Sequence, residues 1–318
     1  MMHTPAFWYQ PRGAVSALLW PLSLLYRFGR WLHVLCSRPQ TFAVPVICVG
    51  NAVAGGAGKT PTVLALVHML REGGVTPHIV TRGYKGKLRG PLQVAPVHTA
   101  TDVGDEALLL AAVAPTWVAR DRAAGIKAAI AAGATCILMD DGLQNPRIKA
   151  SANLLVVDSA AFGNGCLLPA GPLREPLAAL LPRVDAVITI NAPVPDAVKD
   201  KPVFRAVLMP DIAGLDVSKR YVAFSGMARP EKFFATARVA GLNVVATFKY
   251  PDHHILSERE WLSLQRMARE CDAHLLTTTK DAARFDPRQR GQLRILPVAL
   301  TFDDRAPLRL WLKQVSHG

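Results

Sequence analysis

The sequence has few cysteines, and their spacing suits neither disulfides nor a metal. There are five, an odd number, with no CxxC among them, and Cys48 and Cys136 stand inside apolar runs. This usage argues against a disulfide framework and gives a structural zinc site no support. We therefore expect reduced thiols that pack as small hydrophobic side chains.

Long uninterrupted apolar runs are also missing. The apolar stretch at residues 14–26 is shorter than the roughly 18–20 residues of a spanning helix, and Pro21 interrupts it. It also lacks the basic region and small-residue cleavage site of a signal peptide. Leucines, tryptophans and the following Arg27 and Arg30 predict an amphipathic helix within residues 1–40 that lies in a membrane interface. An ordinary helix packed on the core is the alternative that this stretch leaves open.

Acidic residues are scarce relative to basic ones. The chain has 24 Asp and Glu against 37 Lys and Arg, a formal net charge of +13. Such an excess indicates an anionic partner, which can be nucleic acid, an anionic membrane surface or a phosphorylated substrate. The sequence contains no zinc module, RNA-binding signature or dense basic helix, so we do not expect a nucleic-acid partner. With 50% hydrophobic residues, general disorder is excluded.

Short apolar runs alternate with segments of helical spacing through residues 41–192. The runs are residues 43–49, 77–81, 136–139, 154–157 and 186–190. This alternation predicts an α/β lobe with a parallel sheet and helices on both faces. The proline-containing stretch 193–202 is a predicted linker. Residues 203–318 are predicted to form a second, smaller α/β lobe, whose last helix can pack back on the first lobe.

A glycine-rich loop follows the first of these apolar runs. Residues 53–60 read VAGGAGKT and open a helix. Such glycines let backbone N–H groups cradle phosphate oxygens, and the helix N-terminus adds partial positive charge. The pattern predicts a P-loop, although Val53 stands where the usual motif has its first glycine. A glycine-rich turn with a chance GKT is the alternative. The residues expected at the nucleotide are Gly55, Gly56, Ala57, Gly58, Lys59, Thr60 and Pro61.

The apolar run at 136–139 ends in two acids, Asp140 and Asp141. A carboxylate at the carboxyl end of a parallel strand can reach a Mg²⁺ ion at a neighbouring P-loop, as a Walker B strand does. In that arrangement Lys59 reaches the β- and γ-phosphates, and Thr60 ligates the metal. The alternative is an Asp pair that opens a turn before Gly142.

Several other side chains are candidates that the residues alone leave open. Asp105 precedes a helix, where it can be a catalytic base or a helix N-cap. His253 follows an apolar run of the second half and can tune a carboxylate, bind phosphate or lie in a solvated loop. Arg122 and Arg174 can clamp phosphates or form surface salt bridges.

Taken together, these segments resemble the tetraacyldisaccharide 4′-kinase family. The matching stretches are VGNAVAGGAGKTP (49–61), TRGYKG (81–86), GDEALLL (104–110), RDR (120–122), MDDGLQN (139–145), LLPAGPLREP (167–176), FSGMARPEKFF (224–234), PDHH (251–254) and TTTKDAAR (277–284). They follow one another in order over nearly the whole chain.

The resemblance implies an activity and a location. The enzyme is expected to use ATP and Mg²⁺ to phosphorylate the 4′-hydroxyl of a tetraacylated glucosamine disaccharide 1-phosphate, giving lipid IVA in lipid A biosynthesis. It is expected at the cytoplasmic face of the inner membrane of a Gram-negative bacterium, with the N-terminal helix on the membrane and no obligate protein partner. The alternative is another P-loop NTPase or a small-molecule kinase; no NKxD motif for guanine is present.

The resemblance also implies residue roles. Asp105 is the implied catalytic base and His253 its partner, with Lys59 and Asp141 also catalytic. Thr60, Asp140 and Glu106 are the implied metal ligands, and Arg122, Arg174 and Glu175 are implied near the nucleotide. Asn145 stands where the family often has His, and Leu143 where it often has Phe. Both departures concern substrate packing beside the Walker B turn.

Overall fold

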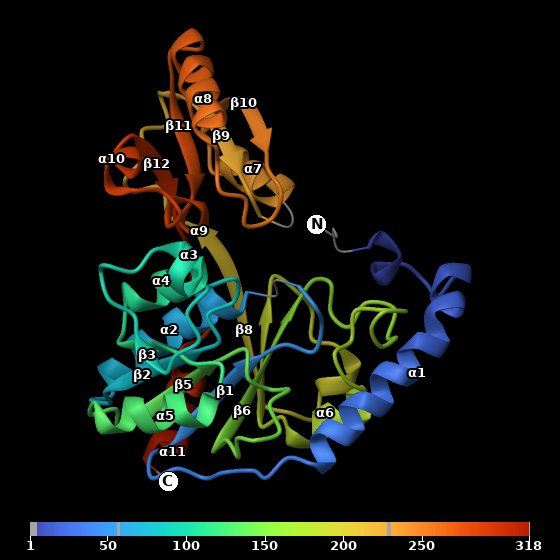
Figure 1. The fold of residues 1–318 in the computed structure, drawn as a ribbon. Helices are drawn as coiled ribbons and strands as arrows, with labels where there is room; N and C mark the ends of the chain where they lie inside the picture. The colour runs from blue at the N-terminus through green and yellow to red at the C-terminus, as the bar shows by residue number, and fades with distance from the viewer. Residues whose placement is uncertain (1–4, 56–57, 228–229, 318) are drawn as a thin grey trace.

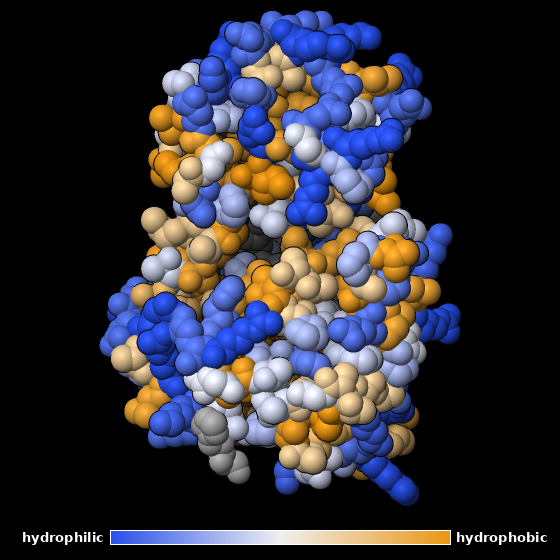
Figure 2. Space-filling model, turned by 90° about the vertical axis from the view of Figure 1, so that its left-hand side faces the viewer, coloured by the Kyte–Doolittle hydropathy of each residue, from blue (hydrophilic) through white to orange (hydrophobic). Residues whose placement is uncertain are grey.

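The computed structural model describes residues 5–55, 58–227 and 230–317. Two lobes are stacked one above the other, and the long helix α1 (Ala14–Leu35) lies along the side of the larger lobe (Figure 1). The surface is hollowed between the lobes on the face turned away from α1 (Figure 2). None of the helices in the described residues is both long and apolar enough to span a membrane.

The larger lobe is built on a mainly parallel sheet. Its strands, in spatial order, are β13 (Val298–Phe302), β8 (Val203–Pro210), β7 (Ala186–Ile190), β6 (Ala152–Asp158), β1 (Val46–Gly50), β5 (Cys136–Asp140), β2 (Pro77–Thr81), β4 (Thr116–Val118) and β3 (Leu92–Gln93). Only the two edge strands of this described sheet, β13 and β3, pair antiparallel to their neighbours. Since β1 lies between β5 and β6, the carboxyl ends of β1 and β5 meet at one edge.

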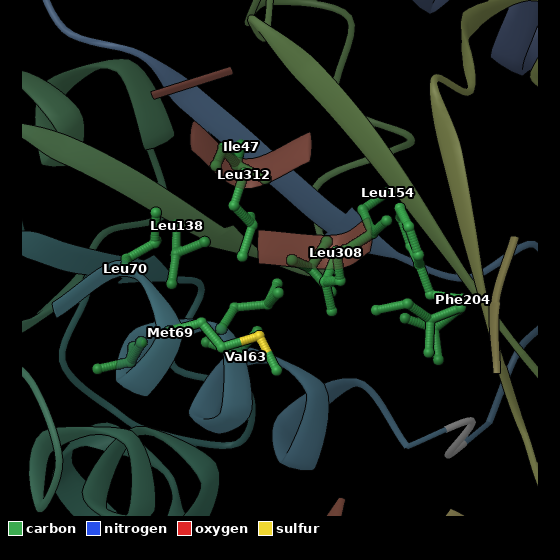
Figure 3. Packing of buried hydrophobic residues seen from close by; sticks show 14 of the residues in the cluster. Ile47, Val63, Met69, Leu70, Leu138, Leu154, Phe204, Leu308 and Leu312 are labelled. Atoms are coloured by element: carbon green, nitrogen blue, oxygen red, sulfur yellow. The ribbon is translucent and has the colours of Figure 1, made fainter. Parts of the chain in front are cut away.

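The strands are apolar on both faces because helices cover both. Along β1, Ile47 and Val49 belong to one buried cluster, and Val46 and Cys48 belong to the other. Helices α2 (Lys59–Glu72) and α11 (Ala306–His317) pack on the first face, which Figure 3 shows at close range. Helices α5 (Arg122–Ala131) and α6 (Leu177–Leu180) pack on the second. Cys48 and Cys136 are buried free thiols, as expected.

The smaller lobe repeats this layering around a parallel sheet of β10 (Asn243–Lys249), β9 (Arg220–Ser225), β11 (Ala273–Thr278) and β12 (Leu293–Leu296). Helix α7 (Pro230–Val239) packs on one face, and α8 (Glu258–Glu270) packs on the other. The remaining helices of the described residues are η1 (Ala6–Tyr9), α3 (Ala100–Val103), α4 (Asp105–Ala111), η2 (Leu181–Arg183), η3 (Asp196–Val198), α9 (Thr279–Ala282) and α10 (Pro287–Arg290). Helix α4 of the larger lobe contacts α9 of the smaller one.

The α/β fold with helices on both faces of a parallel sheet confirms the expected class, but the strand pairing corrects the predicted boundary at residue 203. Strand β8 pairs with β7, and β13 returns from the smaller lobe to pair with β8. Leu308 and Leu312 of α11 are buried in the core of the larger lobe, in agreement with the expectation that the last helix can pack back on it. Residues 203–210 and 298–317 therefore belong to the first lobe, because their apolar side chains complete its sheet and core.

Candidate active site

The backbone turns into α2 at a glycine that no other residue can replace without strain. Gly58 has φ +80, and a Cβ there would come within 2.6 Å of Ile190 Cδ1. The hydroxyl of Thr62 donates to the Gly58 carbonyl at 2.9 Å. Pro61 lies in the first helical turn, where its missing N–H costs little. Two of the expected loop residues, Gly56 and Ala57, lie outside the described residues.

The loop is held from the side by the segment at residues 172–174. Val53 forms an antiparallel bridge with Leu173. Backbone hydrogen bonds run from Ala54 N to the Pro172 carbonyl at 2.8 Å and from Arg174 N to the Ala52 carbonyl at 2.9 Å. Val53 is buried in this contact. A packed side chain at this position accounts for the departure from the usual first glycine.

Lys59 begins α2 and faces oxygen atoms. Its Nζ donates to Asn51 Oδ1 at 3.1 Å and lies 3.7 Å from Asp141 Oδ1. Asn51 in turn donates from Nδ2 to the Gly55 carbonyl at 3.2 Å. Asn51 therefore links the lysine to its own loop, a role that the sequence analysis missed although Asn51 lies inside the recognised motif.

Asp141 is paired with Arg174. One guanidinium nitrogen of Arg174, Nη1, lies 2.8 Å and 2.9 Å from the two carboxylate oxygens. Burial would raise the pKa of Asp141, but the positive charges of Lys59 and Arg174 outweigh it and hold that pKa below the usual range. Asp141 is therefore ionised, and it pairs with Arg174 beside the phosphate loop.

Asp140 has the opposite electrostatic environment. Thr81 donates to its Oδ2 at 3.2 Å, while Oδ1 is buried and lacks a hydrogen-bond partner among the described residues. Burial, then the charges of Glu106 and Asp141, raise the pKa of Asp140 to about 7. A buried, unpaired carboxylate oxygen at the end of β5 fits a divalent cation, because oxygen is the ligand that Mg²⁺ prefers.

Arg122 begins α5 and is buried beneath Asp140. Its Nη1 donates to the Ala119 carbonyl at 3.0 Å, and its Nη2 lies 3.5 Å from the backbone carbonyl of Asp140. Burial lowers the pKa of Arg122. Its contacts support the backbone at the end of β5.

Glu175 is buried beside the same loop, with 3% of its side chain exposed. Its Oε2 accepts from Arg30 at 2.7 Å and from Arg183 at 2.6 Å, and Gln144 lies 3.4 Å from Oε1. Glu175 therefore pairs with Arg30 of α1 and Arg183 of η2. The sequence did not indicate these contacts.

The two departures from the family pattern lie in the turn after β5. Leu143 is buried against Gly50, where an added Cβ would come within 2.7 Å of Leu143 Cγ. Asn145 Oδ1 accepts from Arg147 N at 3.0 Å within the same turn. Both residues thus have local packing or turn contacts.

A second group of side chains meets where the lobes face each other. Asp105, at the first position of α4, lies 2.8 Å from His253 Nδ1 through its Oδ2. The same oxygen accepts from Arg284 Nε at 3.0 Å and Nη2 at 2.7 Å. The expected pair of Asp105 and His253 is thus brought together from opposite lobes, and Arg284 is an addition that the sequence analysis did not single out.

The charges around Asp105 keep it ionised. Burial would raise its pKa, but the hydrogen bond from His253 and the charges of Lys280 and Arg284 hold the pKa well below its usual range. Glu106, expected at the metal, lies 3.0 Å from Lys280 of the other lobe. Its charge also contributes to the raised pKa of Asp140, which links this group electrostatically to the phosphate loop.

Comparisons with known proteins agree over nearly the whole chain. A family model described as tetraacyldisaccharide-1-P 4′-kinase matches residues 15–317. Proteins named tetraacyldisaccharide 4′-kinase from Rhodospirillum centenum and Bradyrhizobium diazoefficiens are 48% and 46% identical, over 100% and 97% of this chain and 98% and 95% of theirs.

A solved structure agrees in fold. It is LpxK from Aquifex aeolicus in complex with ATP, which superimposes with a TM-score of 0.78 at 24% identity and covers 95% of this chain and 100% of that one. The match to the family model and the identity to these relatives confirm the resemblance drawn from the motifs, and the chain therefore belongs to the tetraacyldisaccharide-1-P 4′-kinase family.

Proposed function

We propose that this protein transfers the γ-phosphoryl group of ATP to the 4′-hydroxyl of a tetraacylated glucosamine disaccharide 1-phosphate. The observation that carries the proposal is Lys59 at the start of α2, 3.7 Å from the carboxylate of Asp141, which directly follows Asp140 at the end of β5. Membership of the family supplies the acceptor, because the curated relatives are named for it.

The residues at the phosphate loop bind and orient the nucleotide. Lys59 exchanges its bond to Asn51 for the β- and γ-phosphates, and backbone N–H groups at the start of α2 face the same oxygens. The residues that would hold Mg²⁺ are Asp140, through its unpaired oxygen, and Thr60 in the first turn of α2, through its hydroxyl. Mg²⁺ would neutralise charge on the phosphate oxygens when bound. Glu106, the third expected ligand, would first have to leave Lys280.

The 4′-hydroxyl of the acceptor lipid is activated by Asp105 and His253, which meet between the lobes. In the transfer, the oxygen of the 4′-hydroxyl forms a bond to the γ-phosphorus as the bond from that phosphorus to the β-γ bridging oxygen breaks. ADP leaves with the electron pair, and the hydroxyl proton passes to the Asp105–His253 pair.

We further propose that α1 rests on the cytoplasmic face of the bacterial inner membrane. The polar residues Ser16, Ser23 and Arg30, spaced by seven, face the protein: Ser23 donates to the Leu167 carbonyl, and Arg30 bonds to Glu175. The apolar residues face outward, with Leu18 79% and Leu25 68% exposed. A helix with its polar stripe turned inward leaves its apolar surface for lipid, and the exposed Arg27 suits anionic headgroups.

The proposal is tested by incubating the full chain with γ-labelled ATP, Mg²⁺ and the disaccharide lipid in mixed micelles. We expect transfer of one phosphate to each lipid, at the 4′ position by NMR of the product. Transfer to a soluble metabolite with none to the lipid would instead support a small-molecule kinase.

A further inference from the structure

Lys280, in the short helix α9 of the smaller lobe, is a cation of the cleft that has no role in the proposed function. Its Nζ lies 3.0 Å from Oε1 of Glu106, which belongs to α4 of the larger lobe. Burial would lower the pKa of Lys280, but the charges of Glu106 and Asp105 outweigh burial and raise that pKa. The ammonium therefore keeps its charge, and it links the two lobes through one carboxylate.

Helix α4 brings this ion pair close to the phosphate loop. It contacts α9, which carries Lys280, and also α2, which begins with Lys59. The charge of Glu106 contributes to the raised pKa of Asp140, whose Oδ1 is buried and unpaired among the described residues. Like charges raise a carboxyl pKa in this way when they lie close together. Two lysines from opposite lobes therefore flank the end of β5, Lys59 directly and Lys280 by way of Glu106.

The backbone that carries Lys280 is fixed, whereas its side chain can exchange its partner. Thr278 caps α9 by accepting from Asp281 N at 3.0 Å, and Ser225 donates to Asp281 Oδ2 at 2.8 Å. In contrast, Glu106 is the one hydrogen-bond partner of the Lys280 side chain in the described part of the chain. An ammonium can donate three hydrogen bonds. Since this side chain is 23% exposed, an acceptor in the cleft can reach it.

The carboxylates of the cleft leave little free positive charge for a triphosphate. Arg174 already compensates Asp141. ATP with a bound Mg²⁺ ion still carries negative charge, and the oxygens of the γ-phosphoryl group must be stabilised while it is transferred. Lys280 is held by Glu106, which is itself an expected metal ligand. If Glu106 is released to that role, the ammonium of Lys280 becomes free for the phosphate.

We infer that Lys280 is a catalytic residue supplied by the smaller lobe: it exchanges Glu106 for a non-bridging oxygen of the γ-phosphate and stabilises the charge on that group during transfer. The inference rests on the proposed function and adds one phosphate contact to it. Lys280 keeps its protons throughout, and the bonds that form and break at the γ-phosphorus are those given above. ADP lacks a γ-phosphate, so the exchange is specific for ATP.

An ion pair that only holds the lobes together is the other role open to Lys280 and Glu106. Such a pair would respond in the same way to ATP and to ADP, and substitution of either residue would break it with the same result. A contact to the γ-phosphate instead predicts opposite effects of the two substitutions, because Lys280 attracts the phosphate while Glu106 competes for the lysine. The difference in affinity between ATP and ADP therefore separates the two roles.

The test is the dissociation constant of ATP and of ADP in EDTA, measured by calorimetry on the full chain. Lys280→Met should weaken ATP binding by about 10- to 100-fold, the equivalent of one hydrogen bond to a charged group, and leave ADP binding nearly unchanged. Glu106→Gln should tighten the binding of ATP more than that of ADP. This extra gain should vanish when Glu106→Gln is combined with Lys280→Met. Lys280→Arg, which keeps the charge, should retain most of the preference for ATP.

Turnover provides the second measurement. In lipid phosphorylation with saturating ATP and Mg²⁺, Lys280→Met should lower kcat about 10²- to 10³-fold, since a donor to developing charge is lost. The matched control is Lys219→Met, because Lys219 is exposed and precedes the amino end of β9, whereas Lys280 follows the carboxyl end of the parallel strand β11. The control should bind both nucleotides and turn over like the wild type.

Equal changes in ATP and ADP affinity in the Lys280→Met protein, or a normal kcat of that protein, would overturn the inference and leave an ion pair between the lobes. The Glu106→Gln comparison does not require any Lys280 variant to fold, and an equal gain for both nucleotides there would overturn the inference too. A wild type that binds ATP but phosphorylates no lipid would overturn the proposed function, and the difference between ATP and ADP would still decide whether Lys280 contacts the γ-phosphate.

Discussion

Arg30 of α1 donates to Oε2 of Glu175 at 2.7 Å, and this contact ties the N-terminal helix to the segment that borders the phosphate loop. Glu175 directly follows Arg174, whose backbone N–H holds the loop at Ala52 and whose side chain holds Asp141. The helix proposed to rest on lipid therefore contacts the residue next to Arg174, and Arg174 pairs with Asp141.

The buried position of Glu175 predicts a large stability effect. Replacing Glu175 with Gln leaves Arg30 without its carboxylate, and breaking a buried pair costs about 3–5 kcal/mol. Arg183→Gln is the matched control, because Arg183 reaches the same oxygen but is 43% exposed, and it should cost under about 1 kcal/mol. Urea unfolding measures both changes in the free energy of unfolding. Equal effects of the two substitutions would show that burial does not govern this cluster.

Lys59 is predicted to be required for normal turnover with ATP. Lys59→Met removes the positive charge next to Asp141, and loss of one donor to developing charge typically costs about 10²–10³ in kcat. The matched control is Lys127→Met, an exposed lysine of α5, which should retain normal turnover. Steady-state kinetics with varied ATP provide the measurement. Normal turnover by Lys59→Met would remove this loop from the reaction.

The sequence predicts those strands that a short stretch of neighbouring residues is enough to identify. Strands β2 and β7 begin and end at the residues that the apolar runs predicted, because strands covered by helices on both faces are mostly apolar. The assignment of β8 and β13 to the larger lobe could not be read in this way. The proline-containing stretch before β8 resembles a linker, but strand pairing depends on which sheet edge is available, and that edge is made by residues far away in the chain.

At the candidate active site, too, the residues of local motifs were predicted and the pairs between distant residues were not. Lys59, Asp140 and Asp141 were predicted because a phosphate loop and a strand ending in acids have fixed local spacing. Arg284 lies 179 residues from Asp105, and Arg30 lies 145 residues from Glu175. Nothing in the local pattern around an arginine identifies which carboxylate it will meet. The recognised stretch that ends at Arg284 was the only signal available for it.

Asp140 predicts how the stability of the metal-free protein depends on pH. Its pKa is raised to about 7 by burial and by the charges of Glu106 and Asp141, against about 3.9 in an unfolded chain. Between these values the folded state holds a proton that the unfolded state has lost. This group therefore lowers the free energy of unfolding as the pH rises from about 4 to 7.

The expected result is a loss in wild-type stability relative to Asp140→Asn over this window, by roughly 4 kcal/mol at most. Urea unfolding in EDTA at pH 5 and pH 8 measures it. Added Mg²⁺ should stabilise the wild type more at pH 8 than at pH 5, since the ionised carboxylate binds the cation, and should stabilise the variant little at either pH. If the free energies of unfolding of the two proteins changed in parallel with pH in EDTA, the raised pKa of Asp140 would be contradicted.

The outward face of α1 predicts that membrane binding depends on particular leucines. Leu18 and Leu25 lie seven residues apart on the exposed side, and fully burying a leucine in an apolar phase is worth about 1.5–3 kcal/mol. Replacing both with serine should weaken binding to anionic vesicles at least 10-fold, because about 1.4 kcal/mol accounts for each factor of ten. Activity in detergent micelles should change little, since neither side chain reaches the nucleotide loop.

Val239→Ser and Leu310→Ser, which alter comparably exposed apolar residues elsewhere, are the controls. Vesicle co-sedimentation measures the binding, and equal losses in the α1 and control variants would mean that α1 has no special contact with lipid.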